Sequence, residues 1–190
     1  KLSLVNQREI GSDTLNFSKG LKSLLRQDPD VVLVGELRDQ ETIEAALTIA
    51  ETGHLVFGTL HTNSTIQTIN RIVNVFAADQ QEQIRTLLSF VLQGVIAQQL
   101  LPKIPKGRVA VQEILRITPA IRNLIREDKV HQIYSQMQIG QDETGMSTMN
   151  QGLKKLLDGG VITAESALAY TNSPEELQRM MGLTSAPRKK

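Results

Sequence analysis

Four consecutive apolar residues at 31–34, followed at once by charged residues, limit what this chain can fold into. The run is Val31-Val32-Leu33-Val34, and such a run is typical of a short strand buried on both faces of a parallel sheet, where polar alternation is lost. It ends in Gly35-Glu36-Leu37-Arg38-Asp39, at the strand end where open α/β sheets hold their ligands. An acid there can hold a Mg²⁺-bound water or orient a nucleophile. A strand that simply meets polar loop residues is the open alternative.

Strands and helices alternate through the first half of the chain. We expect strands at 2–5, 31–34 and 54–61 and helices at 17–25, 40–52 and from Asn63 or Ser64 to about 75. This order predicts an α/β fold with a parallel sheet and right-handed crossovers, in which strands 31–34 and 54–61 are near neighbours.

The pattern changes after residue 79. An amphipathic helix reaching about Val95 is expected, and then a hairpin that pairs 96–101 with 108–115. Thr118 and Pro119 open an all-helical segment, in which we expect a polar loop at 140–147 and a capping box at Ser173. The predicted domains are therefore residues 1–116, an α/β core, and 117–190, a helical appendage whose tail at 186–190 is solvated.

Composition excludes several classes of function. Aromatic residues make up 3% of the chain and the net charge is +1, which argues against a nucleic-acid partner. There is no cysteine, so disulfides and thiolate metal sites are excluded and a reducing cytoplasm is favoured. No apolar run is long enough to predict a membrane span.

Two histidines flank the predicted strand 54–61. His61 should lie at the same sheet edge as Glu36, where it could donate a hydrogen bond to a terminal phosphate or to an attacking water. His54 should lie at the opposite end, so a His–His metal pair is not expected. Arg38 and Asp39 either form a local ion pair that opens the next helix, or Arg38 contacts a phosphate. Both alternatives stay open.

A phosphate-binding loop of the form G-x-x-x-x-G-K-[ST] is missing from these residues. The glycine pairs with the right spacing are Gly53/Gly58 and Gly140/Gly145, and neither is followed by lysine. The 190 residues alone should therefore not bind nucleotide in the P-loop manner. Because the chain starts at Lys1 and enters an apolar run directly, we expect it to be a fragment of a longer domain.

Two segments resemble motifs of the type II/IV secretion ATPase superfamily. RQDPDVVLVGELRD at 26–39 is similar to its Walker B region, where the acid is a Glu after Gly, and TGHLVFGTLHT at 52–62 is similar to its His box. The resemblance implies a RecA-like core in a ring-shaped homo-hexamer that hydrolyses ATP with Mg²⁺. It implies that Glu36 lies beside Mg²⁺ through a water, that His61 senses the γ-phosphate, and that His54 is the first His-box residue. The family's phosphate loop and catalytic Glu would lie upstream.

A third segment points to one branch of that superfamily. It is similar, letter for letter, to the signature of pilus retraction ATPases and consists of Ala120, Ile121, Arg122, Asn123, Leu124, Ile125, Arg126 and Glu127. The resemblance implies a motor for pilus retraction and twitching motility, cytoplasmic but held peripherally at the inner-membrane pilus base. There the outward face of Arg122, Asn123 and Arg126 would couple it to a platform protein, with the extension ATPase as a further partner. On the residues alone, that face would be interpreted as a solvated helix surface, and only the resemblance favours a coupling role.

Two alternatives are kept. A pilus-assembly or type II secretion ATPase of the same superfamily would share the motifs, although such proteins usually carry a four-cysteine zinc element that this chain lacks. A non-hydrolytic interaction module would keep the fold without any phosphate loop.

Overall fold

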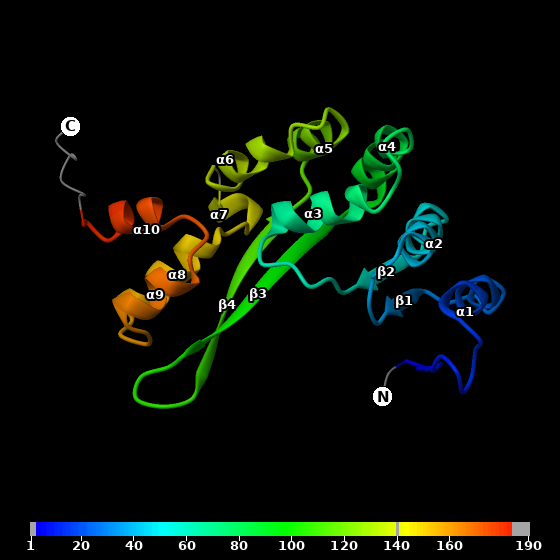
Figure 1. Ribbon diagram of the computed structural model, residues 1–190, viewed down its shortest axis with the longest axis horizontal. Coiled ribbons are helices and arrows are strands. Elements are labelled where there is room, and N and C mark those ends of the chain that lie inside the picture. Colours follow the sequence, from blue (N-terminus) through cyan, green and yellow to red (C-terminus); the bar gives the residue numbers. More distant parts are fainter. Residues whose placement is uncertain (1–2, 140, 184–190) are drawn as a thin grey trace. The chain divides into compact units, whose positions relative to one another are not determined.

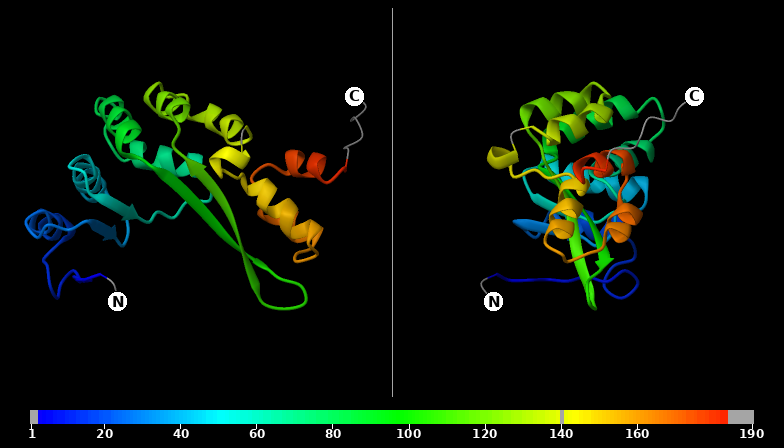
Figure 2. Two further views of the ribbon diagram at one scale, coloured as in Figure 1. Left: turned by 180° about the vertical axis from the view of Figure 1, so that it is seen from behind. Right: turned by 90° about the vertical axis from the view of Figure 1, so that its left-hand side faces the viewer.

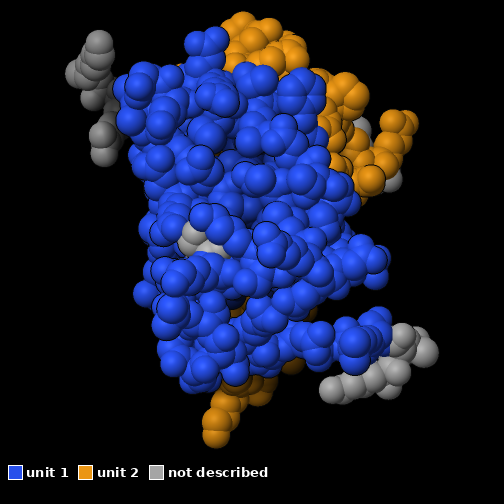
Figure 3. Space-filling view, turned by 90° about the vertical axis from the view of Figure 1, so that its right-hand side faces the viewer, with its two compact units in different colours: residues 1–61, 71–92 blue, residues 62–70, 93–190 orange. Residues whose placement is uncertain are grey.

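The computed structural model describes residues 3–139 and 141–183, and Figure 1 shows the order of their helices and strands. The chain divides into two compact units, coloured separately in Figure 3. Unit 1 holds residues 1–61 and 71–92, and unit 2 holds residues 62–70 and 93–190. The hairpin therefore groups with the helical segment in these units, whereas the predicted domain boundary at residue 116 stays a prediction.

Unit 1 is built on two parallel strands, β1 (Val31–Val34) and β2 (Leu55–Gly58), in the register Val31↔Leu55 to Val34↔Gly58. Its helices are α1 (Phe17–Leu24), α2 (Gln40–Glu51) and α4 (Gln81–Val91). The pairing of these two strands confirms the predicted parallel arrangement. The prediction of a strand at 2–5 is wrong for residues 3–5, the part of it that the structure describes. Leu4 and Val5 are exposed, and no strand in the described part of unit 1 pairs with them.

Only one face of the β1–β2 sheet is buried. Val32 and Val34 are 3% and 2% exposed, whereas Val31 is 53% and Leu33 is 71% exposed. On β2, Leu55 and Phe57 are exposed as well. The prediction of a strand buried on both faces is therefore wrong. The run of valine and leucine is consistent with a strand covered on both faces, but no element in the described part of unit 1 covers the second face.

Helix α3 (Thr65–Asn74) follows β2 at the predicted place. Of the two candidate caps, Ser64 caps the helix, since its Oγ accepts a hydrogen bond of 3.2 Å from the backbone N–H of Gln67. Ile69, Ile72 and Val73 are buried, as the helical spacing predicted.

Unit 2 contains a long antiparallel hairpin of β3 (Gly94–Pro102) and β4 (Arg108–Arg116), the twisted ribbon in Figures 1 and 2. The predicted hairpin is confirmed, but the preceding helix ends at Val91 instead of about Val95. Leu92 is already extended, and Val95 pairs with Leu115 in the ladder. The backbone pairing of the strand overrides the apolar helical spacing at this position.

One face of the hairpin packs against the helical segment. The helices of this segment are α5 (Pro119–Arg126), α6 (Ile133–Met137) after a 3₁₀ turn at Val130–Gln132, α7 (Gln141–Thr144), α8 (Met149–Asp158), α9 (Ala164–Tyr170) and α10 (Pro174–Met180). The buried core they form with the hairpin consists of Leu101, Val111, Met149, Leu153, Ile162, Ala167 and Leu177. Aliphatic side chains and methionines fill it, as the low aromatic content required.

Two local predictions in the helical segment are wrong. The expected loop at 140–147 contains the short helix α7. The expected capping box at Ser173 does not form, because the Ser173 side chain makes no capping hydrogen bond. The box is found at Thr148 and Gln151 instead. The tail at 186–190 lies outside the described residues.

Glu176, the acid expected to complete the Ser173 box, binds other helices. Its Oε2 accepts hydrogen bonds from the Tyr134 hydroxyl (2.6 Å) and the Asn150 amide (2.7 Å), and its Oε1 accepts one from Gln138 (2.7 Å). Burial, together with the bond to Glu176, raises the pKa of Tyr134, so its hydroxyl stays protonated and donates. The carboxylate thus ties α10 to α6 and α8.

None of the helices within residues 3–139 and 141–183 is both long and apolar enough to cross a bilayer.

Candidate functional site

Glu36, Arg38 and His61 meet beyond the carboxyl ends of β1 and β2, and we call them the strand-end cluster. The Oε1 atom of Glu36 lies 2.6 Å from Nε of Arg38 and 2.9 Å from Nε2 of His61. The Glu36 side chain is 23% exposed, whereas those of Arg38 and His61 are 72% and 77% exposed. The prediction that Glu36 and His61 share one sheet edge is thus confirmed by their geometry.

The backbone after the two strands fixes this arrangement. The N–H of Leu37 donates to the carbonyl of Thr59 (2.9 Å), and the Thr59 hydroxyl donates to the carbonyl of Gly35. Leu37 turns inward and is 9% exposed, which leaves its neighbours Glu36 and Arg38 on the outer side. A Cβ at Gly58 would come within 2.5 Å of Leu37 Cδ1 and 2.9 Å of Cγ, so glycine leaves room for the Leu37 side chain.

Electrostatics keep Glu36 ionised at neutral pH. The hydrogen bond and charge of Arg38 lower the pKa of Glu36, His61 lowers it further, and partial desolvation opposes them. Glu36 in turn raises the pKa of Arg38. The cluster is therefore an anionic carboxylate flanked by a cationic guanidinium and an imidazole. Both of these flanking groups are exposed enough to reach a ligand.

The two alternatives for Arg38 and Asp39 are resolved in part. Asp39 caps α2, since its Oδ1 accepts a hydrogen bond of 2.9 Å from the N–H of Thr42. Arg38 pairs with Glu36, so no Arg38–Asp39 ion pair is needed to open the helix. A contact between Arg38 and a phosphate stays a prediction.

The other histidines lie apart from the cluster. His54 precedes β2, where its Nδ1 is 3.0 Å from the Thr52 hydroxyl and 3.2 Å from the Ile49 carbonyl. It therefore holds the end of α2 against the start of β2, at the opposite end of the strand from His61 as predicted. His131 is exposed in the 3₁₀ turn of unit 2.

The cluster contains one carboxylate that could face a metal. No group of three or more potential ligands among His, Cys, Asp and Glu occurs within residues 3–139 and 141–183. Oε1 of Glu36 is engaged by Arg38 and His61, but Oε2 has no partner in the part of the chain that the structure describes. One free carboxylate oxygen fits Mg²⁺, which keeps several waters and is commonly held by one or two carboxylates and substrate phosphates.

Helix α5 carries the segment 120–127. The Thr118 hydroxyl caps it by accepting from the N–H of Ile121, and Ile121 and Ile125 are fully buried. Ala120 is exposed and Leu124 is half-buried, so the two isoleucines form most of the inward face of the helix.

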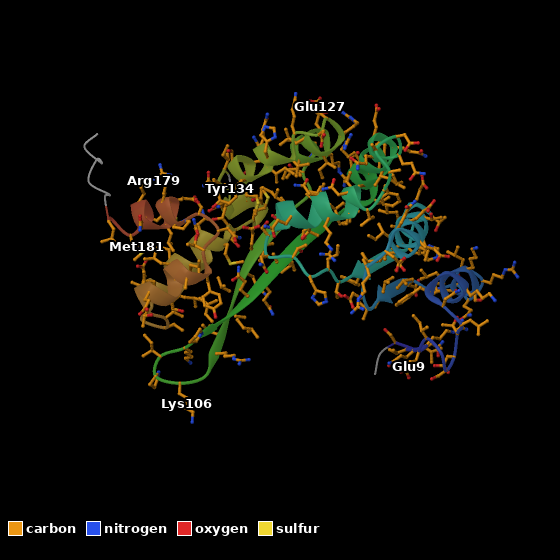
Figure 4. The ribbon with its side chains drawn as sticks, viewed as in Figure 1. Glu9, Lys106, Glu127, Tyr134, Arg179 and Met181 are labelled. Atoms are coloured by element: carbon orange, nitrogen blue, oxygen red, sulfur yellow. The ribbon has the colours of Figure 1, made fainter. Side chains whose placement is uncertain are left out.

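The polar side chains of α5 form a network around Glu127, which Figure 4 labels at the end of the helix. Glu127 accepts hydrogen bonds of 2.8 Å from both Asn123 Nδ2 and Lys129 Nζ. Arg126 donates to Asn123 Oδ1. These donors, Lys129 first, lower the pKa of Glu127. The outward face expected from the sequence is thus organised by hydrogen bonds, and Lys129, which follows the segment 120–127, belongs to the network.

Comparisons with known proteins agree with these features. A family model described as "Type II/IV secretion system protein" matches residues 2–105. The type IV pilus retraction ATPase PilT of Pseudomonas aeruginosa is 57% identical over 175 residues, covering 92% of this chain and 51% of PilT. A twitching motility protein of Neisseria gonorrhoeae is 53% identical over 178 residues, covering 93% of this chain and 47% of that protein.

A solved structure is similar as well. The crystal structure of the pilus retraction motor PilT with bound ADP aligns with a TM-score of 0.86 at 57% identity, over 93% of this chain and 50% of that one. The chain thus spans about half the length of the curated relatives it matches. The family model covers more than half of the chain, and its matched region includes the whole strand-end cluster. The chain therefore belongs to the type II/IV secretion system protein family.

Proposed function

We propose that this chain supplies the acid and histidine side of an ATP-hydrolysing site in a type IV pilus retraction motor. The observation that carries the proposal is the strand-end cluster, in which Glu36 Oε1 lies 2.9 Å from His61 Nε2 beyond two parallel strands. The likeness to PilT, whose structure contains ADP, supports nucleotide as the ligand. In this proposal the two-stranded sheet is part of a RecA-like core that assembles as a homo-hexamer.

Each residue of the cluster has a distinct role in the proposed site. Glu36, ionised at neutral pH, holds a water of hydrated Mg²⁺ through its Oε2 atom. Bound Mg²⁺ would supply charge neutralisation on the phosphates. Glu36 holds the His61 imidazole, whose ring is exposed, so the imidazole can donate a hydrogen bond to the γ-phosphate. Arg38 is tied to Glu36 and keeps the remaining guanidinium nitrogens for a phosphate oxygen.

The rest of the proposed site comes from outside these residues. The sequence has no G-x-x-x-x-G-K-[ST] loop, and the curated relatives are about twice as long as the segment they share with it. We infer that the phosphate loop and a catalytic base belong to that further chain. The motor would work at the cytoplasmic face of the inner membrane, with a pilus platform protein and the extension ATPase as partners.

The proposed function is tested on the full-length protein. We expect its sequence to contain a phosphate loop, the purified protein to hydrolyse ATP, and deletion of its gene to give abundant pili without twitching. Loss of pili on deletion would favour an assembly or secretion ATPase of the same family. If the full-length sequence lacks the phosphate loop and the protein shows no measurable ATP hydrolysis, the motor proposal is rejected and the alternative of a non-hydrolytic interaction module remains.

The segment 120–127 is proposed to transmit the motion of the motor. Arg122 lies on the half-buried polar side of α5, in the helix whose network is centred on Glu127. We expect Arg122→Ala to leave ATP hydrolysis largely intact and to abolish twitching, because the change removes a surface cation and leaves the strand-end cluster unchanged. Twitching zones and ATPase rates measure the two effects.

A matched control is Lys155→Ala, which removes an exposed cation from α8. It should preserve both activities. Normal twitching of the Arg122→Ala strain would show that this side chain does not couple the motor to its load.

A further inference from the structure

The hydrogen-bond ladder between β1 and β2 shifts by one residue at Glu36. Where the pairing begins, the N–H of Leu55 donates to the carbonyl of Asp30, one residue before the β1 partner of Leu55. The bonds of a parallel ladder are evenly spaced, so the carbonyls of residues 55, 57 and 59 should accept from the N–H groups of residues 32, 34 and 36. The Thr59 carbonyl instead accepts from the N–H of Leu37 (2.9 Å). Glu36 is therefore an extra residue, a bulge, at the end of β1.

This bulge decides which way the Glu36 side chain points. Successive side chains of a strand alternate between the two faces, and Val32 and Val34 point to the buried face of the sheet. Regular alternation would place Glu36 on that face next. The extra residue gives the place to Leu37, which is 9% exposed. The Glu36 carboxylate is thereby released to the edge of the sheet, where it meets the imidazole of His61.

Thr59 binds the peptide groups on both sides of the bulge. Its carbonyl accepts a hydrogen bond from the N–H of Leu37, and its hydroxyl donates one to the carbonyl of Gly35. The Thr59 side chain is exposed, so within the part of the chain that the structure describes it acts through this hydroxyl and not by filling a core. Both neighbours of Glu36 in the chain are thus tied to one residue, which follows β2 directly.

We propose that Thr59 is a positioning residue for Glu36, which holds the bulge and thereby keeps the carboxylate 2.9 Å from Nε2 of His61. The inference rests on the proposed function, since it assigns Thr59 to the acid of that site, and all of these residues belong to unit 1. Without the hydroxyl, the Gly35 carbonyl loses its donor and the ladder can return to regular spacing. Glu36 would then take the Thr59 carbonyl with its own N–H, and its side chain would leave the strand-end cluster.

Thr59→Val and Thr59→Ser in the full-length protein test the proposal. Valine keeps the β-branched shape and removes the hydroxyl, whereas serine keeps the hydroxyl. We expect Thr59→Val to lower kcat for ATP hydrolysis by about tenfold or more with KM nearly unchanged, because small displacements of a catalytic group cost this much. Thr59→Ser should recover most of the rate. A normal kcat in Thr59→Val, measured beside an inactive Glu36→Gln, would overturn the proposal.

Thr48→Val is the matched control. Thr48 is an exposed residue of α2 in the same unit, and its hydroxyl also donates to a backbone carbonyl, that of Glu44, at 2.8 Å. The substitution is chemically identical but lies away from the strand-end cluster, so kcat should stay normal. An equal fall of kcat in Thr48→Val and Thr59→Val would show a general effect of losing a hydroxyl and would overturn the positioning role.

A second measurement does not depend on catalysis. Glu36→Ala supplies the reference NMR signals of a His61 imidazole that has lost its carboxylate partner. In the nucleotide-free protein, the His61 signals of Thr59→Val should move toward this reference, and those of Thr59→Ser should stay near the unsubstituted protein. Unchanged His61 signals in Thr59→Val would overturn the proposal. Moved signals, together with normal ATP turnover of Glu36→Gln, would support the positioning role and reject the proposed site instead.

Discussion

Replacing Glu36 by glutamine in the full-length protein is expected to lower kcat for ATP hydrolysis by about a hundredfold or more, while nucleotide affinity changes little. The amide keeps the size of the side chain but removes the negative charge that Arg38 and His61 stabilise. A neutral side chain holds a Mg²⁺-bound water poorly, and lost electrostatic stabilisation of this kind costs two or more orders of magnitude in rate. Steady-state hydrolysis and binding of a fluorescent ATP analogue measure the two quantities.

The same substitution on a neighbouring helix serves as the control. Glu44 is exposed on α2, and Glu44→Gln removes an equal charge without touching the cluster. It should leave kcat unchanged. If Glu36→Gln turns over ATP at the normal rate, Glu36 has no part in the reaction and the proposed site falls.

Truncation of Leu101 to alanine is expected to destabilise unit 2 by about 2–5 kcal/mol. Leu101 is fully buried on β3, in the core shared with Val111, Leu153 and Ile162. Its removal takes several methyl and methylene groups out of that core and leaves a cavity that the neighbours fill only in part. Thermal unfolding of the full-length protein should show the lower stability as a midpoint several degrees lower.

The adjacent leucine provides an internal comparison. Leu100 is 51% exposed on the opposite face of the same strand. Leu100→Ala removes the same atoms, yet it should cost about 1 kcal/mol or less, because surface changes rarely cost more. Equal losses of stability for the two variants would contradict the assignment of the core to the face that α8 and α9 cover.

The geometry of the strand-end cluster could be predicted from sequence because it depends on local rules. An apolar run followed by an acid places Glu36 at the end of a strand, and the parallel neighbour places His61 at the same edge. The partner of Arg38 could not be predicted in this way. The expected partners of Arg38 are Asp39 or a phosphate, whereas the structure pairs it with Glu36. Both carboxylates are close to Arg38 in sequence, and the choice between them depends on Leu37 turning inward beside Gly58.

The errors share a physical cause, which is that tertiary contacts decide between locally reasonable options. Ser173 followed by Glu176 has the pattern of a capping box. The Glu176 carboxylate instead accepts hydrogen bonds from Tyr134 on α6, Asn150 on α8 and Gln138, which follows α6. The helix expected to reach Val95 ends earlier because the ladder with Leu115 competes for the same backbone groups. Hydrophobic periodicity predicts which face of an element is apolar, but it does not predict which hydrogen-bond partner a side chain or backbone group takes in the folded protein.

The sequence prediction missed the buried carboxylate of Glu113, which accepts hydrogen bonds from Thr65 and Met149. The strand pattern nevertheless contained a signal for it. In the alternating segment Val109, Val111, Glu113 and Leu115, the acid falls on the apolar face of the strand. A charged residue at a buried position requires donors that sequence alone cannot locate, since Thr65 and Met149 lie 48 and 36 residues away. Such a break in an alternating pattern is therefore worth treating as a candidate contact between distant elements.

The uncovered face of the β1–β2 sheet has a practical consequence for purified protein. Val31, Leu33, Leu55 and Phe57 present a row of apolar side chains on two neighbouring strands. With a net charge of only +1 near neutral pH, the 190 residues have little electrostatic repulsion to keep copies apart. Sulfate and other excluded salts strengthen apolar association, so they would promote aggregation of these residues when they are handled alone. Low salt and a pH well below the isoelectric point are the favourable conditions for keeping them in solution.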